Sequence, residues 1–386
     1  MLQHGNSDLG DPASRRVTAL TGVILAAGLM LSGCGDSEQP PVDGSADGTP
    51  VPAAGESMPG VTVPGAGLAP ADSAAGGSVP PVTCDLPTTF SWTSSQPLIT
   101  PRPPAGRTFA SIKDPTIVSY EGKYHVFASV YETTPGADGY KSVYTSFSDF
   151  AEADAAPQVY MPELPTGSTV APEVFYFAPQ NLWYLIYQWG ARYSTNTDIN
   201  NPQGWSAPRP LLAGEPPNAL DFWVICDATD CHLFFSRDDG VLYKSKTPIG
   251  SFPSFSGYEI VMQEPSAGLL FEASNVYKVD GTNQYLLLVE AYGPRYFRSW
   301  TAESLDGPWA PLADTQQNPF AGAANVTFEG GSWTDDISHG ELIRSGFDQT
   351  LSINACKMQY LYQGTAPTFQ GDYNLIPYRL GLITLQ

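Results

Sequence analysis

The chain has 386 residues, of which 39 are acidic and 18 are basic, so its formal net charge is −21. This excess of negative charge disfavours binding to nucleic acids or anionic lipid surfaces through charge. Only 15% of the residues are charged and 12% are aromatic, a balance that suits a neutral sugar polymer, because aromatic rings stack on the C–H faces of sugars.

Residues 1–34 are predicted to be an export signal. Arg15 and Arg16 provide a basic start, and residues 17–31 form an apolar stretch that is too short for a comfortable membrane span. Residues 31–34, Leu-Ser-Gly-Cys, resemble a bacterial lipobox, which implies a lipid anchor on Cys34 as the only membrane contact. We therefore expect an extracellular protein tethered to the bacterial surface. An ordinary signal peptide is the alternative, and the sequence does not separate general from twin-arginine export.

Residues 35–82 are predicted to be a disordered linker. Pro, Gly, Ala, Ser, Asp and Val dominate this segment, which holds no aromatic residue. Such a composition cannot bury enough apolar surface to offset the entropy of ordering the chain. We expect a flexible tether that lets an anchored domain reach a polymer.

Residues 83–386 are predicted to form one large all-β domain, because they are rich in aromatic residues and lack long helical patterns. A crude repeat runs through them. Half of the repeat is an aromatic strand that starts at Tyr144, Tyr193, Tyr243 and Phe297, with a degraded fifth copy at Tyr362. The other half is an acidic residue that opens an apolar strand, at Asp114, Glu173, Asp221, Glu272 and Glu341. Five such units predict a five-bladed β-propeller, with a β-sandwich as the alternative.

The propeller prediction brings distant residues together. Its blades surround a channel, and the innermost strand of each blade is expected to begin at the acidic position. Several of the five acids should then meet at one rim, although Asp114 and Glu272 lie about 160 positions apart. A closed propeller of this kind is expected to be a monomer.

Four cysteines remain when Cys34 is set aside, and they allow three pairings. Export makes disulfides plausible. We expect Cys226–Cys231 to clip a hairpin and Cys84–Cys356 to join the first residues of the domain to its last sheet. Four buried free thiols are the alternative.

Several short motifs carry a resemblance to a known family. They are Ile112-Lys113-Asp114-Pro115-Thr116, Leu220-Asp221-Phe222-Trp223, Leu270-Phe271-Glu272-Ala273-Ser274, Ser338-His339-Gly340-Glu341, Tyr187-Gln188-Trp189-Gly190 and Ile376-Pro377-Tyr378-Arg379. In order and spacing they resemble glycoside hydrolase family 62, over essentially all of residues 83–386. The resemblance implies an α-L-arabinofuranosidase that acts on arabinoxylan, a five-bladed propeller, an inverting mechanism and often a bound calcium ion.

The resemblance also implies roles for three carboxyl groups. Asp114 is expected to be the general base that activates water, and Glu272 the general acid that protonates the leaving oxygen. Inversion requires two such groups on opposite faces of the sugar. Asp221 is expected to raise the pKa of the acid by its negative charge and to help hold the sugar. For any one acid alone, a backbone-capping role would be the better interpretation.

Further residues are carried over as substrate contacts: Lys113, Gln188, Trp189, Phe222, Arg298, His339 and Tyr378. His339 is also the candidate ligand for calcium at the channel centre. Calcium prefers oxygen ligands, so one histidine is weak support. The alternatives are a solvated Lys113, a Trp189 packed in the core, an ion-paired Arg298 and a neutral, hydrogen-bonded His339.

Two other functions compete with this interpretation. Family 43 hydrolases share the propeller and the carboxylate set, and include β-xylosidases and arabinanases; a polysaccharide-binding propeller without activity is the second alternative. Phosphate loops, zinc-protease motifs and nucleophile elbows are absent from the sequence. The sequence does not indicate O-2 or O-3 preference, tolerance of doubly substituted xylose, or the residues that bind the xylan backbone.

Overall fold

The computed structural model describes residues 84–386. The predicted signal peptide, the lipobox Cys34 and the linker lie outside the described residues. Within the described part there is no α-helix, and no helix is long and apolar enough to cross a membrane. Short 3₁₀ helices interrupt the strands at Phe150–Glu152 (η1), Met161–Glu163 (η2), Ala178–Gln180 (η3), Pro202–Gly204 (η4), Ile249–Ser251 (η5), Ala267–Leu269 (η6) and Tyr373–Leu375 (η7).

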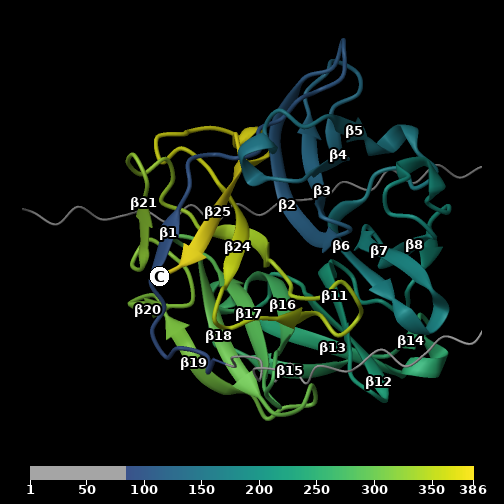
Figure 1. Cartoon of the computed structure of the whole chain (residues 1–386), viewed down its shortest axis with the longest axis vertical. Coiled ribbons are helices and arrows are strands. Elements are labelled where there is room, and N and C mark those ends of the chain that lie inside the picture. Colours follow the sequence, from purple (N-terminus) through teal and green to yellow (C-terminus); the bar gives the residue numbers. More distant parts are fainter. Residues whose placement is uncertain (1–83) are drawn as a thin grey trace, which may run out of the picture. The chain divides into compact units, whose positions relative to one another are not determined.

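Five sheets form the blades of a propeller (Figure 1). Blade I contains β2 (Phe109–Tyr120), β3 (Lys123–Glu132), β4 (Gly139–Phe147) and β5 (Gln158–Tyr160). Blade II contains β6 (Val170–Phe177), β7 (Leu182–Gln188), β8 (Arg192–Asn196) and β9 (Arg209–Pro210). Blade III contains β11 (Leu220–Cys226), β12 (Asp230–Ser236), β13 (Val241–Pro248) and β15 (Glu259–Gln263).

Blade IV contains β16 (Glu272–Val279), β17 (Tyr285–Ala291), β18 (Tyr296–Ala302) and β19 (Ala310–Thr315), extended by β20 (Asn318–Pro319) and β23 (Ser352–Ile353). Blade V contains β22 (Ser338–Leu342), β24 (Gln359–Gly364), β25 (Arg379–Leu385), β1 (Trp92–Ser94) and β21 (Val326–Phe328). A separate parallel pair joins β10 (Leu212–Ala213) to β14 (Phe255–Ser256).

The innermost strands close a ring. β2 contacts β6, β6 contacts β11, β11 contacts β16, β16 contacts β22, and β22 contacts β2. The strands next to them are covered on both faces by neighbouring blades, which is why β17 is apolar and buried at nearly every position. The outermost β15 is mostly exposed. This arrangement confirms the predicted five-bladed propeller and excludes the β-sandwich.

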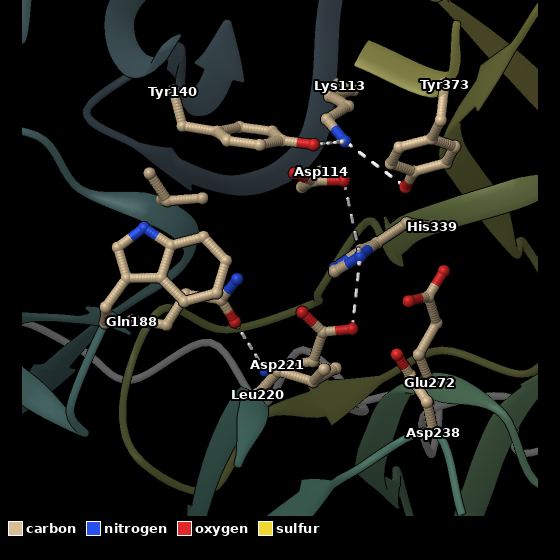
Figure 2. A pocket seen from close by; sticks show the side chains of 12 residues that line it. Lys113, Asp114, Tyr140, Gln188, Leu220, Asp221, Asp238, Glu272, His339 and Tyr373 are labelled. Carbon is tan, nitrogen blue, oxygen red and sulfur yellow. Dashed lines mark hydrogen bonds and ion pairs between the residues drawn. The ribbon is translucent and has the colours of Figure 1, made fainter. Parts of the chain in front are cut away.

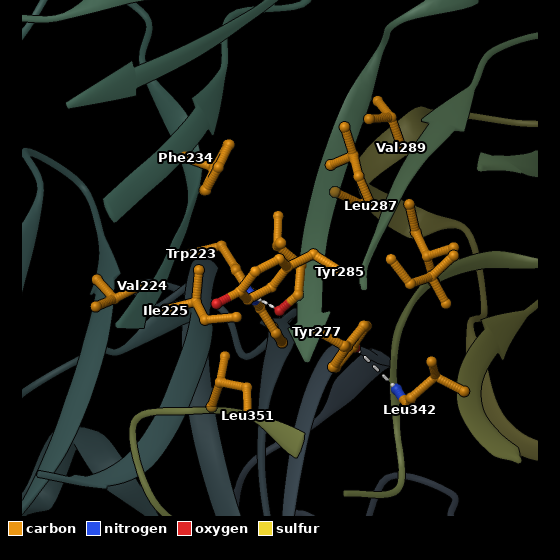
Figure 3. Close-up of a cluster of buried hydrophobic side chains, with 14 of the residues drawn as sticks. Trp223, Val224, Ile225, Phe234, Tyr277, Tyr285, Leu287, Val289, Leu342 and Leu351 are labelled. Atoms are coloured by element: carbon orange, nitrogen blue, oxygen red, sulfur yellow. Dashed lines mark hydrogen bonds between the residues drawn. The ribbon is translucent and has the colours of Figure 1, made fainter. Parts of the chain in front are cut away.

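Packing between blades is apolar and tight, as the contact between blades III and IV illustrates (Figure 3). The rings of Trp223 and Tyr277 meet edge to face, with centroids 5.4 Å apart. The indole N–H of Trp223 donates to the Val276 carbonyl at 3.0 Å, and the Leu342 amide donates to the Tyr277 hydroxyl at 3.0 Å. The polar atoms of these buried aromatic residues are thus satisfied, as burial requires.

The ring is closed by the two ends of the domain, which lie side by side in blade V (Figure 1). β1 pairs antiparallel with the last strand, β25. The disulfide Cys84–Cys356 joins the same two regions, and Cys226–Cys231 links the facing ends of β11 and β12. Both predicted disulfides are therefore confirmed.

One part of the predicted repeat is wrong. Tyr144, Tyr193, Tyr243 and Phe297 all lie in the third strand of their blades, as expected. Tyr362, taken as the fifth copy, lies in β24, which is the second strand of blade V. The third strand of blade V is β25, which begins at Arg379 and lacks the aromatic residue of the other four, so the aromatic pattern at Tyr362 was assigned to the wrong strand.

Candidate functional site

One small cavity at the rim of the channel collects the three predicted catalytic acids (Figure 2). Its volume is about 180 Å³, below the range of drug-sized pockets and suited to one small unit. It is lined by Lys113, Asp114, Tyr140, Val170, Gln188, Trp189, Leu220, Asp221, Asp238, Glu272, His339 and Tyr373. Blades I, III and IV each contribute one of the three acids.

A β-bulge near the start of each innermost strand aims these residues. The register skips between Lys113 and Thr116, Val170 and Glu173, Leu220 and Trp223, Glu272 and Asn275, and Ser338 and Gly340. Four bulge residues have positive φ, namely Asp114 (49°), Ala171 (43°), Asp221 (54°) and Ala273 (53°). Non-glycine residues rarely adopt this conformation, and bulges commonly redirect a side chain at an active site.

Each bulge amide donates to a side chain of the preceding blade. The pairs are Asp114 N–H to Gln363 Oε1 (2.6 Å), Ala171 N–H to Ser129 Oγ (2.8 Å), Asp221 N–H to Gln188 Oε1 (2.9 Å), Ala273 N–H to Asp221 Oδ2 (2.8 Å) and His339 N–H to Glu290 Oε2 (2.9 Å). These bonds satisfy donors that the bulge removes from the ladder. They also tie neighbouring blades together at the level of the cavity.

Three of the five strand-opening acids reach the cavity, in line with the prediction that several would meet, whereas Glu173 and Glu341 do not. Both lie beyond the bulge, fully buried within the ring. Glu341 pairs with Arg344 at 2.7 Å, and Glu173 accepts the Val224 amide at 2.6 Å. The sequence aligned these acids with the other three because all five precede apolar residues, whereas the bulge displaces them by up to three positions.

Asp114 and Asp221 face one histidine. Nδ1 of His339 lies 3.6 Å from Oδ1 of Asp114 and 3.6 Å from Oδ2 of Asp221 (Figure 2). Burial, followed by repulsion from Glu272 and Asp114, raises the pKa of Asp221 well above its usual value. Asp221 also accepts the Ala273 amide, the residue after Glu272, so it positions the strand that carries the third acid.

Glu272 is paired with a buried arginine that the sequence analysis missed. Nη1 of Arg295 donates to Oε1 of Glu272 at 2.6 Å and to Oε1 of Glu290 at 2.8 Å. Burial raises the pKa of Glu290 to about 7, with Arg295 opposing the rise. Asp238 lies on the same side of the cavity, and burial together with the negative charge of Glu272 raises its pKa to about 7.

Lys113 is held among tyrosine rings rather than solvated. Its Nζ lies 3.3 Å from the Tyr140 hydroxyl and 3.5 Å from the Tyr373 hydroxyl, and 5.9 Å from the ring centroid of Tyr378. Burial is the largest single influence and opposes its charge, but Asp114, Tyr373 and Tyr140 together outweigh it and raise the pKa of Lys113. A fixed cation therefore stands beside the predicted base.

Aromatic residues form the mouth of the cavity. The Trp189 side chain is 59% exposed, so it is not a core residue, and its ring meets that of Tyr140 edge to face at 6.1 Å. Tyr373, on η7, is 50% exposed on the lining of the same cavity. An exposed tryptophan and tyrosine at a polar cavity are suited to contact with sugar rings.

Three predicted substrate contacts do not line the cavity. Arg298 is held away from it by Glu264 and Asp314. Phe222 is buried and packs on Phe235, with ring centroids 5.7 Å apart. Tyr378 is buried behind Lys113.

Four cavity or neighbouring residues were missed by the sequence analysis: Tyr140, Asp238, Arg295 and Tyr373. Asp238, with a positive φ of 58°, lies in the turn between β12 and β13. The other three come from loops or strand edges whose approach to the cavity depends on how the blades are arranged.

Residues 84–386 contain no group of three or more His, Cys, Asp or Glu side chains that could hold a metal ion. Calcium favours several oxygen ligands, and His339 offers a nitrogen beside the carboxyl groups of Asp114 and Asp221. These side chains do not by themselves form a calcium site. Calcium at His339 stays a prediction, and the mechanism below uses no metal.

Comparisons with known proteins agree with this geometry. The sequence model described as glycosyl hydrolase family 62 matches residues 91–384. The chain is 55% identical over 312 residues to α-L-arabinofuranosidase C of Cellvibrio japonicus, covering 80% of this chain and 49% of that protein. The chain thus spans about half the length of this curated relative.

Solved structures give the same result. The catalytic domain of a family 62 α-L-arabinofuranosidase from Coprinopsis cinerea superposes with a TM-score of 0.75 and 52% identity, covering 78% of this chain and 98% of that one. An α-L-arabinofuranosidase from Podospora anserina, solved with cellotriose, gives a TM-score of 0.74 and 48% identity, covering 78% of this chain and 99% of that one.

Proposed function

Because the chain belongs to glycosyl hydrolase family 62, we propose that it removes single α-L-arabinofuranosyl groups from arabinoxylan by hydrolysis with inversion. The observation that carries the proposal is the convergence of Asp114, Asp221 and Glu272 from three blades on one small cavity. A side group of one sugar fits such a cavity, whereas an internal segment of a polysaccharide chain would need an open groove.

The carboxyl groups of Asp114 and Glu272 have the chemistry that an inverting hydrolase needs. We assign Asp114 as the general base that takes a proton from water, and Glu272 as the general acid that gives a proton to the leaving xylose oxygen. The oxygen of water forms the new bond to the anomeric carbon as the glycosidic bond breaks on the opposite face. Lys113 stands next to Asp114 as a buried cation beside the proposed base.

Asp221 acts between them. Its carboxyl group accepts the Ala273 amide and so fixes the backbone beside Glu272; burial and the neighbouring Glu272 and Asp114 raise the pKa of Asp221. We further propose that Lys113, Gln188, Trp189 and His339 contact the bound arabinose, since all four line the cavity.

The test is product analysis on wheat arabinoxylan. We expect free arabinose with an intact xylan backbone, and proton NMR should show the β-anomer first. Asp114→Asn and Glu272→Gln should each lower turnover by about 10²–10⁴-fold, the contribution of general acid–base catalysis. Release of xylose or of shortened arabinan would instead support a family 43 type of activity, and binding without any product would support the non-catalytic alternative. A first-formed α-anomer would contradict inversion.

We also propose that the protein is exported and anchored to the cell surface by a lipid on Cys34, with the linker as tether. The support is the Leu-Ser-Gly-Cys sequence after the apolar stretch. Metabolic labelling of the full chain with a radioactive fatty acid should label the wild type and leave Cys34→Ala unlabelled and released. Equal labelling of both would contradict the anchor.

A further inference from the structure

Arg295 is an enclosed cation at the side of the cavity. Only 7% of its surface is exposed, and its guanidinium lies 4.9 Å from the ring centroid of Phe271 and 5.2 Å from that of Tyr292. One nitrogen, Nη1, donates both to Glu272 and to Glu290. A buried arginine with two carboxylate partners keeps its charge and changes the proton affinity of each partner.

Two of the five residues that cap the bulges are carboxylates, Asp221 and Glu290, and Glu290 is the one that lies on a second strand. The equivalent second-strand positions in other blades hold Ser129, Gln188 and Gln363, which accept a bulge amide without carrying a charge. Blade IV has a carboxylate there. Glu290 accepts the His339 amide as the others do, and in addition accepts from Ser338 Oγ at 2.8 Å and from Arg295. Capping alone does not require a charge, so the charge serves Arg295.

We propose that Arg295 and Glu290 are positioning residues that set when Glu272 holds its proton, Arg295 by favouring the carboxylate and Glu290 by offsetting that cation. This inference rests on the proposed function, in which Glu272 must be protonated to act as the acid. Arg295 fixes the carboxyl group in place but favours loss of the proton. Glu290, behind the arginine, returns most of the proton affinity while leaving the geometry unchanged.

Other charged and titratable groups surround Glu272 and are the same in all the variants below. From blades I to III they are Lys113, Asp114, Tyr140, Asp221 and Asp238; from blade V and the segment before β25 they are His339, Tyr373 and Tyr378. Because these groups stay constant, a shift between variants reports the Arg295–Glu290 pair.

The two residues can be separated because their removal should have opposite effects. In the pH profile of kcat/KM on arabinoxylan, the alkaline limb reports loss of the proton from the acid of the free enzyme. Arg295→Met should move this limb to higher pH by about one unit or more, the size of a close charge effect. Glu290→Gln should move it to lower pH, because Arg295 then faces Glu272 alone. Combining the two substitutions should bring the limb back toward the wild type.

Two conservative variants, Glu290→Gln and the added Arg295→Lys, keep the test independent of folding. Glu290→Gln retains a bulge acceptor, as glutamine already serves at Gln188 and Gln363. Arg295→Lys keeps the charge, so its limb should stay within a few tenths of a pH unit of the wild type. Both single shifts in the same direction, or an unmoved limb in Glu290→Gln, would overturn the proposal.

Arg298→Met is the matched control. Arg298 lies three residues further along, is buried to the same degree and has two carboxylate partners, Glu264 and Asp314, away from the cavity. Its loss should lower thermal stability without moving the limb; a shift equal to that of Arg295→Met would contradict a local effect. Failure of the proposed function would be seen differently, as near-normal turnover in Glu272→Gln.

Discussion

Glu173 shows how a single buried carboxyl group couples stability to pH. Its Oε2 accepts the Val224 amide, and its Oε1 is buried without a hydrogen-bond partner among the described residues. Burial raises the pKa of Glu173 well above its usual value. The folded protein therefore prefers the protonated form. The stability that this group contributes is fully present below its unfolded pKa and is lost as the pH rises through the folded pKa.

Glu173→Gln should imitate the protonated side chain at every pH. We expect the substitution to raise the midpoint of thermal unfolding at pH 8 and to change it little near pH 4, below the unfolded pKa. Glu341→Gln is the control: it breaks the buried pair with Arg344 and should destabilise at both pH values, because an uncompensated buried cation is costly. Equal loss of stability at both pH values in Glu173→Gln would contradict the proposed protonation.

Individual residues of the site could be predicted from the sequence where they lie in a short motif that resembles the family. Asp114, Asp221 and Glu272 all line the cavity, as predicted. Arg295 was missed and Arg298 chosen in its place, although both are buried arginines close together in sequence. Only the path of the chain before β18 decides which one faces the cavity, and no local pattern encodes that path.

The bulge is the element that turns an ordinary strand into a site. Gln363 accepts the amide of Asp114, and Ser129 makes the same bond to Ala171, a bulge residue without catalytic chemistry. Gln363→Met and Ser129→Ala both leave a buried N–H unpaired. Each should cost about 1–3 kcal/mol of unfolding free energy, measured by urea denaturation.

Activity separates the two variants. Gln363→Met should also lower kcat on arabinoxylan, because the backbone that aims the proposed base is no longer held. Ser129→Ala should keep a near-normal kcat at a similar loss of stability. If both variants lost the same fraction of kcat, the capping bonds would matter for stability alone.

Elements were predicted well where their pattern is local. The apolar runs that follow an acidic residue located the first strand of each blade. Glu121 and Gly122, both with positive φ, form the turn between β2 and β3. Glu173 and Glu341 were misaligned because a bulge adds residues to one strand without changing its apolar pattern. Register is set by pairing across the sheet, which the sequence of one strand does not contain.

At the scale of the whole molecule, the ring depends on joining its two ends. β1 pairs with β25, so one blade is assembled from residues at opposite ends of the domain. The fivefold repeat predicted the propeller but could not predict this closure, because the closing strand lies outside the repeat. The pair Cys84–Cys356 was predicted as the one that remains once Cys226 is paired with Cys231, its neighbour in sequence.

The two disulfides should therefore contribute very unequally to stability. Cys84–Cys356 closes a loop with a sequence separation of 272, and Cys226–Cys231 one with a separation of 5. Loop-closure entropy predicts about 6 kcal/mol for the first and about 2 kcal/mol for the second. Replacing each pair by serines and measuring urea unfolding without reductant should show the larger loss of unfolding free energy for Cys84→Ser/Cys356→Ser.

The Cys84→Ser/Cys356→Ser variant should also expose β1 to proteolysis first, because the pairing of β1 with β25 would then hold this end of the domain without a covalent link. If its stability fell no further than that of Cys226→Ser/Cys231→Ser, strand pairing alone would be sufficient to close the ring.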